Sequence, residues 1–409
     1  MLEKWIILVL VLLSNAYTVV LNLVKWRSAN NPTPESVSDV YDAETYGTWK
    51  KYSAEHCRLA TYATIADCIA ALVLLATNAY SSFAILFPPA LQLFAVILLE
   101  SIVGAVIDLV RSYVGTMIIE QKYGFNRSTM KTFVMDRIRS LILGIALSFA
   151  LAYLISSIHQ ATGDRMILWF AVAMLAIGLF ATFLYPVFSK IGNKFVPLEE
   201  GELKERLMNL LQKHGYKVKA IQVMDASRRT TKLNAYFTGF GKMKTIVLFD
   251  NLVNAMTPDE ICAVFAHELG HGLHKDVLKR QIMSFANFLL MGLIAWFVVS
   301  TPALRLSFGF LNLNYGFAFI LIGVILGVTQ PLTGMAMNAY SRLAEYRADR
   351  QAVDEGYGEA MIAALKKLGR ENFAHLAPSR SNVVLEYSHP PLNSRIEAIL
   401  RTMEESQLK

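Results

Sequence analysis

Two histidines and a glutamate with the spacing of a metal-binding helix lie within one short segment. In His267-Glu268-Leu269-Gly270-His271 the imidazoles are four residues apart, so a helix places both on one face, where they can bind one metal ion. Thr257, followed by a proline and then by Glu260, predicts the start of that helix. A metal held there would lower the pKa of water, and Glu268 can accept the proton during attack on a carbonyl carbon. The segment predicts hydrolytic chemistry, although such a pattern arises by chance in about one chain in a hundred.

A second polar helix face lies further along the chain. Asn338, Arg342, Glu345 and Asp349 recur at offsets of four, seven and eleven residues, which fall on one side of an α-helix. A catalytic zinc site adds a third protein ligand to a histidine pair, and we assign Glu345 to that position. Asp349 and Arg342 are then expected to support the ligands, with Asp349 orienting one imidazole. The competing interpretation is a helix end held by salt bridges of its arginines, which leaves the aligned Asn338 without explanation.

One further histidine lies in a stiff segment. His389 is followed by Pro390 and Pro391, which restrain the backbone and can hold the imidazole in place. It is a candidate donor to a developing oxyanion. The simpler interpretation is that His389 is an ordinary loop residue.

The composition places these segments in a membrane protein. Of 409 residues, 54% are hydrophobic and 17% charged, whereas typical globular proteins have roughly 45 to 50% and about 25%. A membrane-spanning helix needs about 20 largely apolar residues. Seven stretches satisfy this requirement: Trp5 to Val24, Leu59 to Phe87, Ala90 to Ile118, Leu141 to Ile158, Met166 to Ser189, Ile282 to Leu304, and Tyr315 to about Asn338.

Loop charges predict the orientation of these spans. Lysines and arginines gather after the first and third spans, whereas the loops after the second, fourth and sixth are nearly uncharged. Because basic loops prefer the cytoplasm, the N-terminus is expected outside, and the histidine segment and the C-terminal tail inside. The same loops account for the net charge of +7, and no nucleic-acid-binding motif is present. The first span lacks a basic start and a cleavage site, so no signal peptide is expected.

Several other features complete the pattern. The three cysteines have no Cys-x-x-Cys spacing, so neither a disulfide framework nor a thiolate metal cluster is indicated. Glu100, Asp108 and Arg111 share one stripe of the third span, which is typical either of internal pairing or of a water-filled cavity. Between the fifth and sixth spans, a helix is predicted from Glu199 to His214. A small sheet is predicted from the extended runs Val218 to Met224, Leu233 to Phe240 and Thr245 to Phe249.

These motifs together resemble the type I CAAX prenyl endopeptidases, which are integral-membrane zinc metalloproteases of the gluzincin class. The resemblance implies a mostly α, multi-pass membrane fold, in which about seven transmembrane helices form a barrel around a chamber. It also implies a cytoplasmic metallopeptidase domain with a small sheet, and one Zn²⁺ per chain. The motifs that carry the resemblance are Leu233 to Gly241, Ile246 to Asp250, His267 to His271, Ser341 to Asp349, Ser388 to Pro391 with Arg395, Tyr123 to Arg127, and Pro34 to Tyr52.

The resemblance further implies roles for individual residues. The strand from Asn234 to Gly239, with Ala235, Tyr236 and Phe237, would be the edge that pairs with an extended peptide. His389 and Arg395 would contact the substrate or the transition state, and Asn338 would be an active-site neighbour.

The expected organisation is a membrane domain with five helices over residues 1–195 and a metallopeptidase domain over residues 196–409. Substrates would be peptides or proteins, with or without a lipid anchor, in contact with membrane lipid, and removal of a short C-terminal peptide is the leading hypothesis. The modest length, the minimal outside loops and Gly272, where a bulky residue is expected, depart from the family. They favour a bacterial inner membrane over an endoplasmic reticulum membrane.

Two alternatives follow from the same motifs. A heat-shock-linked, HtpX-type protease would degrade misfolded membrane proteins with the same zinc chemistry, but it should have only four spans. A transporter or channel would use the polar stripe of the third span as a pathway and the histidine pair as a regulatory metal site.

Overall fold

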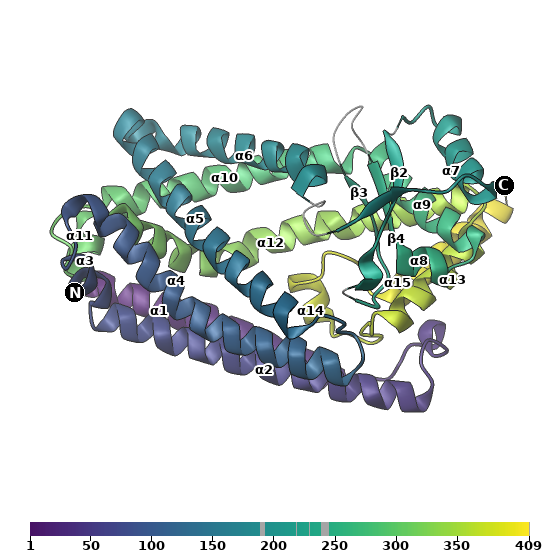
Figure 1. Cartoon of the computed structure of the whole chain (residues 1–409), viewed down its shortest axis with the longest axis horizontal. Coiled ribbons are helices and arrows are strands. Elements are labelled where there is room, and N and C mark those ends of the chain that lie inside the picture. Colours follow the sequence, from purple (N-terminus) through teal and green to yellow (C-terminus); the bar gives the residue numbers. More distant parts are fainter. Residues whose placement is uncertain (189–192, 218, 229, 239–244, 409) are drawn as a thin grey trace.

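The computed structural model describes residues 1–188, 193–217, 219–228, 230–238 and 245–408. The molecule is elongated (Figure 1), with long helices at the end that holds the N-terminus and a small sheet with shorter helices at the other end. The predicted boundaries at Ser189 and Val218, and residues 239–241 of the family motif, lie outside the described residues.

Long apolar helices build the first part of the molecule. In the part of the chain that the structure describes, six stretches are long and apolar enough to cross a membrane, and one of them, Met130–Ala181, contains two helices joined by the turn η4 (Gly163–Arg165). Gly163 has a φ of 52°, which glycine adopts readily. The seven predicted spans therefore correspond to seven long helices: α1 (Leu2–Ser28), α2 (Ala43–Ala76), α4 (Gln92–Ser112), α5 (Met130–Thr162), α6 (Met166–Phe188), α10 (Asp276–Ser300) and α12 (Tyr315–Asp354).

Some predicted boundaries were wrong. The span expected from Leu59 to Phe87 is interrupted, because α2 ends at Ala76 and Asn78 takes a left-handed conformation before α3 (Ala79–Ala84); asparagine tolerates that conformation. The third span continues past α4 as a π-helix, η3 (Tyr113–Glu120). Conversely, α12 is a single helix of 40 residues that carries both the seventh span and the polar face around Glu345.

The long helices enclose a cavity of about 500 Å³, with residues of α1, α2, α4, α5, α6, α10 and α12 in its wall. Glu100 lines this cavity and accepts a hydrogen bond from the Tyr80 hydroxyl. Asp108, on the same stripe, pairs with Arg111 and Arg137. One acid of the stripe therefore lines a cavity and another is internally paired, and a water-filled pathway through this cavity stays a hypothesis.

The predicted small sheet is present, with strand order β1-β2-β4-β3. The pair β2–β4 is parallel and the other two pairs are antiparallel, with Ala235 opposite Leu248 at the start of the β3–β4 pair. Among the described residues no strand pairs with the other side of β3, which is therefore an edge strand. The strands are β1 (Phe195–Pro197), β2 (Ala220–Met224), β3 (Ala235–Thr238) and β4 (Thr245–Phe249), and α7 (Glu202–Lys213) confirms the helix predicted from Glu199 to His214.

Helix α9 (Pro258–Leu273) lies between two hydrophobic clusters. Ile261 and Phe265 pack with strand residues of the sheet. Ala263 and Ala266 instead pack against the C-terminal helices. Burial on both sides fixes α9 in position. The remaining helices are α8 (Asp250–Ala255), α11 (Pro302–Ser307), α13 (Gly358–Glu371), α14 (Arg380–Leu385) and α15 (Leu392–Gln407), with the short helices η1 (Glu35–Val37), η2 (Pro89–Leu91) and η5 (Ala226–Arg228).

Candidate metal centre

Helix α9 begins where the sequence predicts. The Thr257 hydroxyl accepts a hydrogen bond from the Glu260 backbone, and the Glu260 side chain accepts one from the Thr257 backbone, which completes a capping box with Pro258 at the first helical position. Lys367 of α13 adds an ion pair to Glu260 at 2.8 Å. Local signals therefore set the start of the helix, and the two histidines follow on one face.

A glycine between the histidines allows α12 to approach closely. A Cβ atom at Gly270 would lie 3.0 Å from the Cα of Ala348 and 3.0 Å from the Cβ of Gln351. Any larger residue would therefore push the two helices apart. This contact brings Glu345 of α12 against the histidines of α9.

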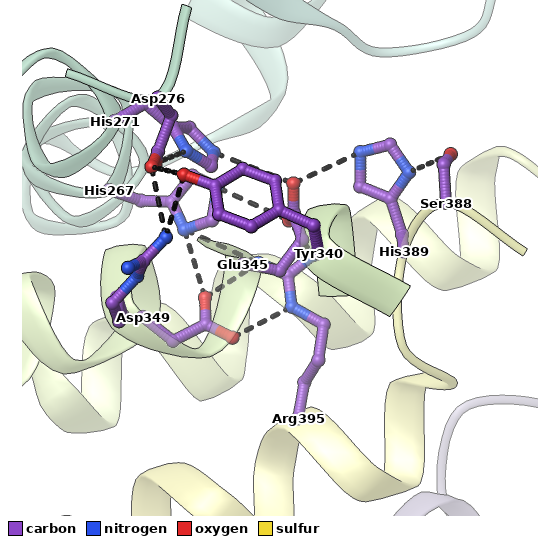
Figure 2. Close-up of polar contacts among 10 residues, drawn as sticks. His267, His271, Asp276, Tyr340, Glu345, Asp349, Ser388, His389 and Arg395 are labelled. Atoms are coloured by element: carbon purple, nitrogen blue, oxygen red, sulfur yellow. Dashed lines mark hydrogen bonds and ion pairs between the residues drawn. The ribbon is translucent and has the colours of Figure 1, made fainter. Parts of the chain in front are cut away.

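The two imidazoles and Glu345 converge (Figure 2). The Nε2 atom of His267 lies 3.5 Å from Oε2 of Glu345, and the Nε2 atom of His271 lies 3.4 Å from Oε1. One ligand atom from each of the three side chains can be chosen so that all lie within 4.8 Å of one another. Within the described residues, Oε2 of Glu345 is buried and accepts no hydrogen bond, although the Arg395 guanidinium forms an ion pair with it at 3.4 Å. A buried carboxylate oxygen of this kind is costly unless further partners, such as a metal cation, bind it. The donor set of two imidazoles and one carboxylate fits zinc.

Each imidazole is oriented from its other side by a buried carboxylate. Nδ1 of His267 lies 2.9 Å from Oδ1 of Asp349, and Nδ1 of His271 lies 3.0 Å from Oδ2 of Asp276. Both aspartates are only 1% exposed. A carboxylate at Nδ1 favours a proton there, so the lone pair of Nε2 points toward Glu345.

Each aspartate is held in turn by an arginine, and Asp276 also by a tyrosine. Arg395 donates to both oxygens of Asp349, at 2.6 and 2.8 Å. Arg347 and the Tyr340 hydroxyl donate to Asp276, at 3.0 and 2.9 Å. These partners compensate for the burial of two charged carboxylates.

Asp276 was missed by the sequence analysis. It follows His271 by five residues, which is not a spacing that shares a helix face. Helix α9 ends at Leu273, and Lys275 takes a left-handed conformation with φ 56° that returns the chain toward the histidine. No periodic signal marks such a turn, so Asp276 could not have been found from spacing.

Glu268 lines a cavity of about 620 Å³. Burial raises the pKa of its carboxyl, and the neighbouring imidazoles of His267 and His271 partly oppose that rise. The same cavity is lined by Asn234, Ala235 and Tyr236 of the predicted substrate-binding segment, and by Glu345, His389 and Arg395. Phe237 follows in β3, opposite Ile246.

The loop that carries His389 is anchored to α12. Arg342 donates to the backbone carbonyls of Val383 and Tyr387, at 2.9 and 2.6 Å. Nε2 of His389 lies 3.3 Å from Oε1 of Glu345, and its Nδ1 lies 2.9 Å from the Ser388 hydroxyl. Arg342 thus acts on the loop rather than on the ligands directly.

Arg395 lines the cavity around Glu268, whereas Asn338 does not. Nη1 of Arg395 lies 3.4 Å from Oε2 of Glu345. Asn338 shares the helix face of Glu345 two turns earlier, but it is not among the residues that line the cavity around Glu268. Its role stays a prediction.

Gly272, the departure from the family noted above, has a neighbour that explains it. A Cβ atom at this position would lie 2.2 Å from the hydroxyl oxygen of Tyr216, which lines the same cavity as Gly272. Gly272→Ala is therefore expected to displace Tyr216 or α9 and to lower kcat/KM about tenfold, since small shifts near a reacting centre are costly. Peptidase assays of the purified variant measure this.

The matched control combines Gly272→Ala with Tyr216→Ala, and it is compared with Tyr216→Ala alone. The double variant should have the activity of the single Tyr216 variant, because the colliding ring is gone. Wild-type activity in Gly272→Ala would contradict the steric explanation.

Long membrane-spanning helices, a buried set of two imidazoles and one carboxylate, and a glutamate in an adjoining cavity define a membrane-embedded metallopeptidase. The chain belongs to peptidase family M48, in the group of CAAX prenyl protease 1. The family described as "Peptidase family M48" matches residues 197–403, and the family described as "CAAX prenyl protease N-terminal, five membrane helices" matches residues 7–190.

Known proteins similar to the chain agree with this family. CAAX prenyl protease 1 of Saccharomyces cerevisiae is 32% identical over 322 residues, which cover 74% of this chain and 70% of the relative. The CAAX prenyl protease 1 homolog of Oryza sativa is 35% identical over 295 residues, 71% of this chain and 69% of the relative. The crystal structure of Ste24p from S. mikatae superposes with a TM-score of 0.90 at 27% identity, covering 97% of this chain and 99% of that chain.

These similarities bear on the alternatives raised by the sequence. Five membrane helices precede the catalytic helix in the matching N-terminal family, which is more than a four-span quality-control protease has in total. The peptidase family covers the histidine pair and Glu345, which favours an enzyme over a transporter or channel.

Proposed function

We propose that the chain is a zinc metalloendopeptidase that cleaves membrane-associated or prenylated CAAX-type proteins, with Glu268 as general base. One observation carries this proposal. A single cavity joins Glu268, the metal-ligand set and the edge strand β3, in a protein whose other part consists of membrane helices.

His267, His271 and Glu345 would hold one Zn²⁺ per chain. Zinc bound by such a set acts as a Lewis acid and lowers the pKa of water toward about 7. Asp349 and Asp276 keep the two imidazoles in the tautomer that leaves Nε2 unprotonated. Glu268 accepts a proton from the attacking water and passes it to the amine that leaves when the peptide bond breaks.

Two further side chains beside Glu345 are assigned roles toward the bound substrate. Arg395 is fixed by Asp349 and points its Nη1 atom toward Glu345. His389 is held near Glu345 by a loop that Arg342 anchors. Donors held in advance at such positions stabilise an oxyanion without reorganisation, and we assign this role to His389 and substrate binding to Arg395. Asn338 is kept as an active-site neighbour that acts on a bound substrate.

The substrate would bind as an added strand. The cavity is lined by Asn234, Ala235 and Tyr236. The outward side of β3, including the backbone of Phe237, would offer hydrogen-bonding groups to an extended peptide. Apolar side chains also line the cavity, among them Leu252, Val264 and Met361. An apolar wall of this kind favours substrates with aliphatic side chains near the scissile bond.

The placement in the membrane is part of the proposal. Basic loops favour an active site on the cytoplasmic side, in a bacterial inner membrane or in an endoplasmic reticulum membrane. We propose that residues 1–195 form the membrane domain that admits lipid-anchored substrates and that residues 196–409 form the metallopeptidase domain.

The test uses the full chain reconstituted in lipid vesicles. A prenylated CAAX peptide and the same peptide without its prenyl group are offered separately. We expect cleavage of the prenylated peptide with kcat/KM at least about tenfold higher, because each buried CH₂ of the lipid strengthens membrane association. A zinc chelator should abolish cleavage, and added zinc should restore it.

Two results would overturn this proposal. Equal cleavage of both peptides would remove the lipid from substrate recognition. Degradation of misfolded membrane proteins without cleavage of either peptide would assign the protein to quality control.

A further inference from the structure

The segment that leads into β3 is held by side chains from distant parts of the chain. The backbone N–H of Leu233 donates to Oδ1 of Asn372 at 2.9 Å, and Nδ2 of Asn372 donates back to the Leu233 carbonyl at 3.0 Å. Nδ2 of Asn251 donates to the Thr230 carbonyl at 2.7 Å, and Asn126 forms an isolated β-bridge with Thr230. Two hydrogen bonds from one side chain to the N–H and the carbonyl of Leu233 hold its backbone in one place.

Lys232, the residue before Leu233, reaches into the membrane domain. Its Nζ atom lies 3.4 Å from Oε1 of Glu120 and 3.4 Å from the hydroxyl of Tyr52. The Tyr52 hydroxyl itself donates to Glu120 at 2.7 Å. Glu120 ends the π-helix η3, an element that is rare and is often found at functional positions.

An aromatic cluster surrounds this lysine. Nζ of Lys232 lies 5.0 Å from the ring centre of Phe125 and 5.9 Å from that of Tyr52, distances at which a cation is attracted to a ring. Phe373 packs edge-to-face on both rings, with centres 4.9 and 5.4 Å away. Tyr52 and Phe125 belong to the two N-terminal motifs whose purpose the catalytic site does not explain.

Phe373 connects the aromatic cluster to the backbone contact. It has a φ of 52°, which a bulky residue rarely adopts. Its neighbour Asn372 makes both hydrogen bonds to Leu233. The two contacts therefore act on adjacent residues, with the Glu120 pair holding Lys232 and the Asn372 pair holding Leu233.

We propose that Lys232, Glu120 and Asn372 are positioning residues that set the register of β3 relative to Glu268. This inference rests on the proposed role of β3 as the substrate-binding edge. Leu233 immediately precedes Asn234, which lines the catalytic cavity. A strand rises about 3.3 Å per residue, and a slip by one residue turns each side chain to the other face, so a fixed register decides where a bound peptide presents its scissile bond.

The geometry favours positioning over simple stabilisation. The side chains of Lys232 and Glu120 are 35% and 20% exposed, and partly exposed ion pairs contribute little to the stability of a fold. Loss of the pair should therefore affect the bound peptide more than it affects folding.

The test compares kinetic constants of Lys232→Met and wild type in the full chain reconstituted in vesicles. Two peptides are used: an extended peptide that covers β3, and a short one that covers only the residues beside the scissile bond. We expect KM for the extended peptide to rise about tenfold, with kcat, zinc content and melting temperature unchanged and with the short peptide unaffected. Lys232→Arg should have the KM of wild type because it keeps the positive charge.

Two further variants keep the inference testable. Asn372→Asp retains the acceptor for the Leu233 N–H but loses the donor to its carbonyl, and it should raise the same KM. Lys204→Met is the matched control, since Lys204 pairs with Glu200 near the start of α7 and should change nothing.

Three results would overturn the inference: unchanged KM in Lys232→Met, failure of Lys232→Arg to restore it, or an activity loss that follows a lower melting temperature or lost zinc. Failure of the proposed function is distinguishable, because wild type itself would then cleave no CAAX peptide. The kinetic comparison can be made on any extended peptide that wild type cleaves.

Discussion

Glu345→Ala is expected to remove the bound metal and all measurable peptidase activity. Glu345 is the proposed third donor, and Nε2 of each histidine faces one of its oxygens, at 3.5 and 3.4 Å. Changes to residues that merely orient ligands cost 10- to 100-fold in metal affinity, so loss of a ligand should cost at least about 100-fold. Elemental analysis of the purified variant and a peptidase assay measure the two losses together.

The control for this substitution is another buried glutamate of the same region. The side chain of Glu355 is 4% exposed and pairs with Lys213 and His214 at the end of α12. Glu355→Ala removes a buried carboxylate of equal size but should retain one zinc per chain. A Glu345→Ala protein that binds zinc as tightly as wild type would remove Glu345 from the ligand set.

The sequence predicted those parts of the site that depend on local geometry. Spacing of four residues placed His267 and His271 on one face, and Thr257 marked the start of their helix because a capping box is a short-range interaction. Glu345 and Asp349, four residues apart, likewise lie on one face of α12, as helix periodicity predicts. Long apolar stretches predicted the membrane helices because a span must be apolar along its whole length.

Contacts between distant segments could not be predicted in this way. Asp276 reaches His271 only because Lys275 turns the chain. The interruption at Asn78 lies within an apolar stretch, where hydropathy gives no signal for a backbone turn. The contact between Lys232 and Glu120 joins residues 112 positions apart, and no periodicity relates residues on different elements.

Glu268→Gln is expected to lower kcat by about 10²- to 10⁴-fold while zinc remains bound. Glutamine has nearly the same shape as glutamate but cannot accept a proton, and general acid–base catalysis contributes a factor of that size. Glu268 lines the cavity beside the metal centre but is not one of the three proposed ligands. Zinc analysis and kcat for a cleavable peptide, measured on the same preparation, separate the two functions.

Glu268→Asp provides the matched comparison. It keeps a carboxylate but shortens the side chain by one CH₂, so it should retain zinc and show activity between those of wild type and Glu268→Gln. Undiminished cleavage by Glu268→Gln would exclude Glu268 as the general base.

The contrast with Glu345→Ala separates the hydrolase from a protein with a regulatory metal site. If the metal only stabilised the fold, the Glu268→Gln protein would keep both its zinc and its activity. If Glu268 is the general base, the same protein keeps its zinc but loses turnover. A zinc-loaded Glu268→Gln protein also keeps β3 as an open edge, so it should bind substrates without cutting them. Comparing uncut proteins in membranes that contain this variant with those in wild-type membranes should identify the substrates, and their termini should mark the bond that the enzyme hydrolyses.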